Sequence, residues 1–241
     1  GFIMHKTDKA DENCSHNFLK FIEKRISGEP LQYILGEWSF MGFDFKVGRG
    51  VLIPRDDTEV VVNLCIDFLE NRTDKKTVDL CSGSGAIAVA LDKISGAEVT
   101  AVEIDETAFS YLETNVKENN SSVKPVMADA LEICETFADG EFDLIVSNPP
   151  YIKSADIETL QKEVRLEPRL ALDGGEDGCD FYREIVSRWS RKLKKGGALA
   201  FELGENQADA VKALMTDKGF SDFKISLDFG GVQRAIIGTL L

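Results

Sequence analysis

The amino-acid sequence predicts an α/β fold with a mainly parallel sheet, and three observations lead to this prediction. Short apolar segments alternate with helical segments from Thr77 onward, as in consecutive βαβ units. A glycine-rich turn joins the first of these strands to the helix that follows it. The last two predicted strands are too close in sequence for a crossover helix, so they must pair antiparallel. We therefore expect a parallel sheet that ends in an antiparallel hairpin.

The region before the sheet is predicted to be helical and then to form a β-hairpin. Apolar residues recur at helical spacing and then give way to Ser27-Gly28-Glu29-Pro30, which ends a helix. Two apolar runs flank Met41-Gly42, which favours a tight turn. The expected elements are a helix at 18–26, strands at 38–40 and 43–47, and a second helix at 60–68.

The remainder of the chain supplies the sheet and its connecting helices. The expected strands are 77–80, 99–102, 123–127, 142–147 and 198–203, followed by the terminal pair 223–227 and 235–240. The expected helices are 86–93, 106–119, 181–194 and 207–218. A parallel sheet completed by such a hairpin is typical of class I (Rossmann-like) methyltransferases, whereas the related dehydrogenase sheet lacks the hairpin.

Composition narrows the possible functions. The 241 residues include 42 acidic and 28 basic side chains, a net charge of −14. Affinity for nucleic acid depends on Lys and Arg displacing counterions, so this charge argues against a free-standing nucleic-acid binder. Five scattered cysteines without a C-x-x-C pair indicate reduced thiols in a cytoplasm and no zinc site. The two histidines, His5 and His16, stand near the start, which argues against a histidine base or metal site. No apolar stretch approaches the ~18 residues that a transmembrane helix needs.

The turn after the first strand of the sheet has the features of a nucleotide-binding loop. Its sequence is Cys81-Ser82-Gly83-Ser84-Gly85. The glycines allow a tight turn and close approach of a ligand, and the following helix offers free N–H groups. Glu103 ends the next strand, where a carboxylate can accept hydrogen bonds from both hydroxyls of a ribose. Together these residues predict a cofactor that contains adenosine.

Two aspartates bear on which cofactor that is. Asp79 stands at the strand end before the turn, where its carboxylate can accept from the amino group of methionine but would repel a pyrophosphate. This favours S-adenosylmethionine over a dinucleotide. Asp129, just past the third strand, can accept from the adenine amino group, although a lone loop Asp is as often a turn former.

The fourth strand of the sheet delivers Asn148-Pro149-Pro150-Tyr151 at its carboxyl end, where open α/β sheets bind ligands. Because two prolines fix the backbone, the Asn148 side chain and the Pro149 carbonyl can accept two hydrogen bonds from one –NH2 group. Such acceptors orient a weakly nucleophilic planar nitrogen and stabilise the positive charge that develops as the methyl group arrives. Tyr151 can cover the face of the planar group. These residues predict methyl transfer to a planar amino group, with S-adenosyl-L-homocysteine as product.

At this point the chain resembles a known family, the release-factor glutamine methyltransferases (PrmC/HemK family). The matching segments are GEPLQYI at 28–34, VLIPRDDTE at 51–59, DLCSGSGAIA at 79–88, NPPYI at 148–152 and EPRLALDGGEDG at 167–178. The resemblance implies methylation of the side-chain N5 of glutamine in the Gly-Gly-Gln motif of peptide-chain release factors. It places cofactor contacts on Cys81 to Gly85, Glu103 and Ala130, and substrate contacts on Asn148 to Tyr151.

The chain departs from the family pattern at several positions. Cys81 stands where the family usually has glycine, Glu103 where it usually has Asp, and Asp56-Asp57 where it usually has Pro-Glu. The family's N-terminal helical domain is longer than the 26 residues before Ser27, so a truncated helical region is expected. We assign residues 1–50 to this helical remnant and a substrate-recognising hairpin, and residues 51–241 to the S-adenosylmethionine-dependent methyltransferase domain.

The residues by themselves leave alternatives open. Adenine N6 or cytosine N4 presents the same planar –NH2 group, which would make the chain a nucleic-acid amino-methyltransferase. An NAD-dependent dehydrogenase shares the glycine turn but leaves Asn148 to Tyr151 unexplained. An inactive module that only binds S-adenosylmethionine conflicts with the intact tetrapeptide.

Two further patterns are not expected to bind a ligand. The segment from Asp173 to Glu184 imitates a calcium loop, but Gly175 occupies a required ligand position, so no metal is expected. Lys192, Lys194 and Lys195 are predicted to be solvated at a helix end, where the helix dipole favours cations.

Overall fold

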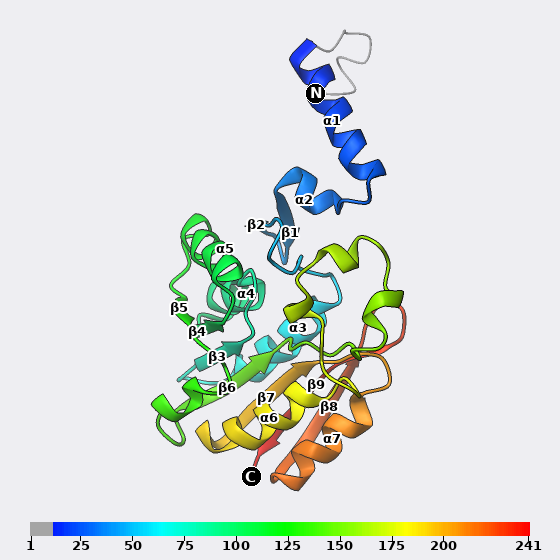
Figure 1. Ribbon diagram of the computed structural model, residues 1–241. Coiled ribbons are helices and arrows are strands. Elements are labelled where there is room, and N and C mark those ends of the chain that lie inside the picture. The colour runs from blue at the N-terminus through cyan, green and yellow to red at the C-terminus, as the bar shows by residue number, and fades with distance from the viewer. Residues whose placement is uncertain (1–11) are drawn as a thin grey trace.

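A computed structural model describes residues 12–241, and its centre is a seven-stranded sheet (Figure 1). The strands are β3 (Lys76–Leu80), β4 (Glu98–Glu103), β5 (Lys124–Met127), β6 (Phe142–Ser147), β7 (Leu193–Glu202), β8 (Phe220–Leu227) and β9 (Gln233–Leu240). Their spatial order is β5-β4-β3-β6-β7-β9-β8. The strands from β5 to β7 pair parallel, and β9 pairs antiparallel with both β7 and β8. Both the parallel sheet and its terminal hairpin are therefore confirmed.

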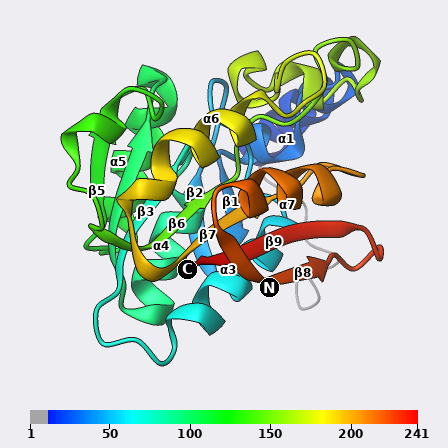
Figure 2. The same cartoon turned by 90° about the horizontal axis from the view of Figure 1, so that it is seen from below.

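Helices cover both faces of this sheet (Figure 2). One face packs against α3 (Thr58–Leu69), α4 (Ala86–Ser95) and α5 (Glu106–Glu118). The other face packs against α6 (Asp180–Trp189) and α7 (Ala208–Asp217). Leu144 and Val146 of β6 face the first layer while Ile145 faces the second, so this strand is buried on both sides. That double burial explains its continuous apolar sequence.

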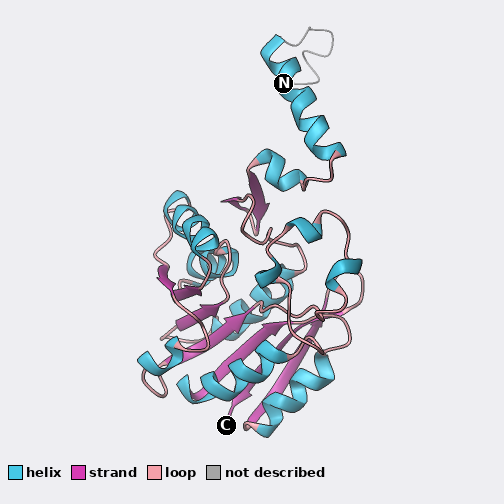
Figure 3. Ribbon diagram, viewed as in Figure 1, coloured by secondary structure: helices cyan, strands magenta, loops and turns pink. Residues whose placement is uncertain are grey.

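The N-terminal part contains α1 (Glu12–Ile26), α2 (Leu31–Leu35) and a hairpin of β1 (Glu37–Phe40) with β2 (Phe43–Lys46). The hairpin is confirmed, and its turn residues Met41 and Gly42 both have positive φ, as a tight two-residue turn requires. The short α2 is not predicted by the sequence pattern. The hairpin is attached to α5, because the Asn115 amide accepts from Lys46 N and donates to Lys46 O. In Figures 1 and 3, α1 extends away from the sheet.

Short 3-10 turns complete the described chain: η1 (Ile133–Thr136), η2 (Ile157–Thr159), η3 (Val164–Leu166), η4 (Arg169–Ala171) and η5 (Ser190–Lys192). Of these turns, η2, η3 and η4 belong to the long connection between β6 and α6. Within residues 12–241, no helix combines the length and the apolarity needed to cross a membrane.

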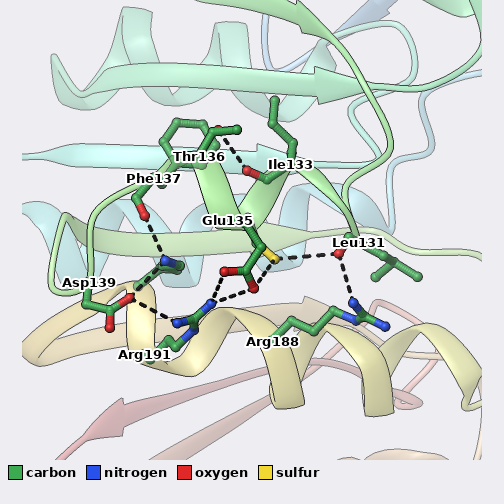
Figure 4. Close-up of polar contacts among 10 residues, drawn as sticks. Leu131, Ile133, Glu135, Thr136, Phe137, Asp139, Arg188 and Arg191 are labelled. Atoms are coloured by element: carbon green, nitrogen blue, oxygen red, sulfur yellow. Dashed lines mark hydrogen bonds and ion pairs between the residues drawn. The ribbon is translucent and has the colours of Figure 1, made fainter.

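The predicted helix at 181–194 is wrong at its C-terminal end, because α6 stops at Trp189 and β7 begins at Leu193. The prediction of solvated lysines is also wrong for Lys192, whose side chain is 3% exposed. Its ammonium donates to Phe137 O at 2.7 Å and pairs with Asp139 at 2.8 Å. Figure 4 shows Asp139 next to Arg191, the residue before Lys192, and both Phe137 and Asp139 are more than 50 residues from Lys192 in sequence. Partners that distant cannot be read from a local run of lysines.

Candidate active site

A cavity of about 240 Å³ lies at the carboxyl edge of the parallel strands. It is lined by the segments that follow β3, β4, β5 and β6, together with residues of the 50–54 segment and of the connection before α6. The predicted site residues that line it are Cys81, Ser82, Gly83, Ser84, Glu103, Asp129, Ala130, Asn148 and Pro150. The structure therefore brings together most of the residues assigned to the cofactor.

The glycine turn wraps one end of this cavity. Cys81, Gly83 and Gly85 all have positive φ, at 60°, 54° and 82°. A Cβ added to Gly85 would lie 2.5 Å from the Leu112 side chain, whereas one added to Gly83 would meet nothing within 4 Å. Gly85 is thus required for both its backbone angle and its packing, and Gly83 for its angle beside the open cavity. Cys81 holds a left-handed conformation that costs free energy for a residue with a Cβ.

Glu103 connects the turn to the end of β4. It is 7% exposed, and its Oε2 accepts from Gly83 N at 2.8 Å. Its Oε1 accepts from Ile104 N at 2.9 Å and Asp105 N at 2.8 Å. A carboxylate offers about four acceptor positions, so about one remains for a ligand hydroxyl. A second ribose hydroxyl would therefore compete with a backbone N–H group.

The two aspartates of the predicted site behave differently. Asp79 is fully buried at the end of β3 and is not part of the cavity wall. Neither of its carboxyl oxygens has a hydrogen-bond partner among the described residues, and burial raises the pKa of Asp79 to about 8. Asp129 does line the cavity, and its Oδ1 accepts from Leu131 N at 2.7 Å. Asp129 is therefore a turn former that also borders the cavity.

Asn148 lies between two cavities. It lines the larger one and also a second cavity of about 140 Å³. The residues that line this second cavity are Leu52, Arg55, Asn148, Tyr151, Ile152, Val164, Ala171, Leu172 and Glu202. Pro149 is buried and borders neither cavity. The Asn148 Nδ2 donates to Thr58 Oγ1 at 3.5 Å, which leaves its Oδ1 as the free acceptor.

Tyr151 is held by its side chain and by its backbone. Its hydroxyl donates to Glu202 Oε1 at 3.0 Å, and its carbonyl accepts from Gln207 Nε2 at 2.9 Å. Burial raises the pKa of Tyr151, and a nearby Glu202 adds to this effect, so the phenol keeps its proton. Sequence reasoning missed Glu202 and Thr58. The rule that singled out Asp79 and Glu103, an acid at the carboxyl end of a strand, applies equally to Glu202 at the end of β7.

The connection between β6 and α6 covers the site and is anchored by buried charge. Glu167 forms an ion pair with Arg55, and its Oε2 accepts from Ile53 N at 3.0 Å. Burial raises the pKa of Glu167, while Arg55 opposes that shift. The pair joins the 50–54 segment to the connection, and both segments line the larger cavity. These contacts hold together two segments of the cavity wall.

The calcium-like segment makes protein contacts instead. Asp173 accepts from Ser154 Oγ at 2.5 Å and from Gly175 N at 3.2 Å, and Asp177 forms an ion pair with Arg183 at 2.9 Å. In the part of the chain that the structure describes, no cluster of three or more His, Cys, Asp or Glu side chains could hold a metal ion.

Comparisons with known proteins agree with this geometry. The methyltransferase small domain family matches residues 55–168, and the PrmC N-terminal domain family matches residues 1–36. The release factor glutamine methyltransferase of Clostridium acetobutylicum is 37% identical over 240 residues, which are 98% of this chain and 84% of that protein. The protein of the same name from Geobacter sulfurreducens is 43% identical over 221 residues, 91% of this chain and 76% of that protein. A crystal structure of a methyltransferase from Pyrococcus furiosus has the same fold, with a TM-score of 0.63 at 21% identity over 95% of this chain and 98% of that chain.

Proposed function

The chain belongs to the family of release factor glutamine methyltransferases, and from this we propose its reaction and its substrate. It transfers the methyl group of S-adenosylmethionine to the side-chain amide nitrogen, N5, of the glutamine in the Gly-Gly-Gln motif of a peptide-chain release factor. The observation that carries this proposal is the position of Asn148 on the wall shared by two cavities. One cavity has the features of an adenosine site, and the other is small and ends at a free amide oxygen.

The residues of the larger cavity fit S-adenosylmethionine. Glu103 offers a fixed carboxylate for the ribose, and the Gly83 turn leaves space for close approach of the methionine part. Asp79 supplies an unpaired buried carboxyl group next to the turn; because it lies outside the cavity wall, a cationic amino group would stabilise its ionised form through a bridging water. Asp129 and Ala130 border the remaining space, where the adenine would lie. When bound, this cofactor supplies an activated methyl group and a good leaving group.

The second cavity fits the acceptor amide. Asn148 Oδ1 accepts from the –NH2 group and holds its nitrogen toward the larger cavity, whereas Pro149, the second predicted acceptor, borders neither cavity. Pro150 and Tyr151 confine the group, since one borders each cavity. The amide nitrogen is a poor nucleophile, so the rate comes from alignment and from acceptors that favour the developing positive charge.

The proposal extends to the roles of the two parts of the chain and to the compartment in which the enzyme acts. Residues 1–50 recognise the protein substrate and residues 51–241 carry out the chemistry, in keeping with the match of residues 1–36 to the PrmC N-terminal domain. The enzyme acts in the cytoplasm, where release factors work and where Cys65, Cys81, Cys134 and Cys179 remain thiols.

A transfer assay tests the proposal. The full chain is incubated with labelled S-adenosylmethionine and, in parallel, with a release factor, the same factor carrying Gly-Gly-Ala, duplex DNA and RNA. Label is expected in the unaltered release factor alone. Label in DNA or RNA, with none in the release factor, would show that the acceptor is adenine or cytosine and that the proposed glutamine substrate is wrong.

A further inference from the structure

A buried acid lies behind the Asn148 to Tyr151 loop, and the reaction described above does not use it. Glu202 ends β7 and is 1% exposed. Its Oε1 accepts from the Tyr151 hydroxyl, while its Oε2 is buried and has no hydrogen-bond partner among the described residues. An unpaired buried carboxyl oxygen costs free energy, so an acid at this place lowers stability relative to an apolar residue. Glu202 also borders the second cavity, which is the proposed site of the acceptor amide. A role in that site would explain why a destabilising acid is present there.

Thr58 connects Glu202 with Asn148. It is the first residue of α3, is 4% exposed, and its Oγ1 accepts from Asn148 Nδ2. Because the oxygen accepts this bond, the hydroxyl proton remains available for another acceptor. Burial raises the pKa of Glu202, and the hydroxyls of Thr58 and Tyr151 are close enough to oppose that shift. The Tyr151 hydroxyl is thus bonded to this carboxyl group, and the Thr58 hydroxyl lies near it.

The contact with Thr58 orients the Asn148 amide as long as the Thr58 hydroxyl gives its own proton to another acceptor, because a free hydroxyl could donate to Oδ1 of the flipped amide. The oxygen and nitrogen of an amide have nearly the same size, so packing by itself does not distinguish two orientations that differ by a 180° flip. With Nδ2 bonded to Thr58, Oδ1 is free to accept from an –NH2 group. The flipped amide would present N–H donors to that group, which has no proton acceptor suited to them.

We propose that Glu202 and Thr58 are positioning residues for the methyl acceptor. Glu202 accepts from the Tyr151 hydroxyl, and Thr58, which accepts from Asn148 Nδ2, fixes the orientation of the Asn148 amide. The inference rests on the proposed transfer to a carboxamide, because the orientation matters only if the acceptor presents –NH2. Thr58 also lines the larger cavity and Glu202 the second one, so kcat has to be compared with the Kd for S-adenosylmethionine to separate positioning from direct contact with a ligand.

Matched variants of the full chain test this role through turnover. Thr58→Val removes the hydroxyl at nearly constant shape, Thr58→Ser restores it, and Thr216→Val makes the same change at an exposed position of α7. We expect Thr58→Val to lower kcat by about 10-fold or more while the Kd for S-adenosylmethionine stays within about threefold. Thr58→Ser should recover most of the loss, and Thr216→Val should show none. Glu202→Gln should also lower kcat, and its effect combined with Thr58→Val should be smaller than the product of the two.

A measurement without substrate separates this inference from the proposed function. In the ¹⁵N-labelled chain, the Asn148 side-chain protons should exchange faster with solvent in Thr58→Val than in the wild type, and Thr216→Val should leave them unchanged. Glu202→Gln gives a second readout of the same kind if Thr58→Val does not fold. Wild-type kcat together with unchanged exchange in Thr58→Val would overturn the positioning role. If exchange is faster in Thr58→Val but the wild-type protein methylates no release factor, the positioning role is supported and the proposed substrate is wrong.

Discussion

Several residues of the site have two roles at once. The same side chain contacts the ligand and makes the protein contacts that hold the site in place. Glu103 binds three backbone N–H groups while it faces the cavity. Asn148 uses one end of its amide for Thr58 and keeps the other for the acceptor. A substitution at such a residue must therefore be judged by both cofactor affinity and turnover, since only their comparison separates the two roles.

Replacement of Asn148 by Ala should lower turnover by ~10²-fold or more, the scale for removal of one fixed group from a site where charge develops. The fold and most of the cofactor affinity should persist, because Asn148 is a small part of the wall of the larger cavity. Asn148→Asp keeps an acceptor but adds charge that stabilises the cationic ground state, so it should slow transfer even if cofactor binding tightens. Release-factor methylation and calorimetry of S-adenosylmethionine binding measure the two effects. A near wild-type rate for Asn148→Ala would falsify the proposed clamp.

Replacement of Asp79 by Asn should stabilise the cofactor-free protein in a pH-dependent way. The pKa of Asp79 is about 8 in the folded chain and 3.8 as the ordinary value. Between these values the unfolded chain carries an ionised Asp79 and the folded chain a protonated one, so the residue lowers the free energy of unfolding as pH rises from about 4 to about 8. Urea unfolding should show the advantage of Asp79→Asn growing over that interval. Affinity for S-adenosylmethionine should fall in the same variant. A stability difference that does not vary with pH would contradict this explanation.

At the scale of elements, helix α4 shows how the cofactor site depends on a defined helix start. Gly85 precedes the helix and Gly96 follows it, and both have positive φ, at 82° and 69°. They differ in surroundings, because a Cβ at Gly85 would strike Leu112 of α5, whereas one at Gly96 would meet nothing within 4 Å. The start of α4 is therefore fixed by packing against another element, and its end by backbone conformation alone.

The two glycines make a matched pair of variants. Gly96→Ala should cost about 1–2 kcal/mol of stability from backbone strain, without a change in the Kd for S-adenosylmethionine. Gly85→Ala should cost more, because it adds the clash with Leu112, and it should also weaken cofactor binding by displacing the turn. Thermal unfolding and calorimetry on both variants test the difference. Equal losses of stability with equal cofactor affinity would show that the Leu112 contact is unimportant.

At the scale of the whole molecule, the local pattern was enough to predict the sheet, its terminal hairpin and the glycine turn. Each depends on neighbours in sequence: apolar runs that alternate with helical segments, a short link between two strands, or glycines at a strand end. The burial of Lys192 was not predictable, because its partners Phe137 and Asp139 lie on a distant segment. The same reason hides Thr58, which reaches the site from α3, whereas Glu202 at the end of β7 follows the strand-end rule that singled out Asp79 and Glu103. Sequence spacing cannot reveal a side-chain contact that only tertiary packing creates.

The charge of the molecule predicts its behaviour toward nucleic acid. With a net charge of −14, the chain should show no measurable affinity for duplex DNA at physiological salt, where even basic proteins bind non-specifically with Kd of about 10⁻⁴–10⁻⁶ M. Filter binding with labelled duplex, in the presence of S-adenosylmethionine, measures this directly. Micromolar binding that weakens steeply with added salt would instead indicate a local basic surface and favour a nucleic-acid substrate.

The common wall of the two cavities has a consequence for inhibitor design. Asn148, Leu52 and Ala171 border both spaces, so groups bound in the two cavities would lie on either side of the same few side chains. A single compound that joins adenosine to a primary carboxamide through a short linker would occupy both spaces at once. Linking turns the second binding event into an intramolecular one, which can raise affinity by about 10²–10⁴ over either half. Such a compound would bind less tightly to any adenosine-binding protein that has no second cavity beside its adenosine site.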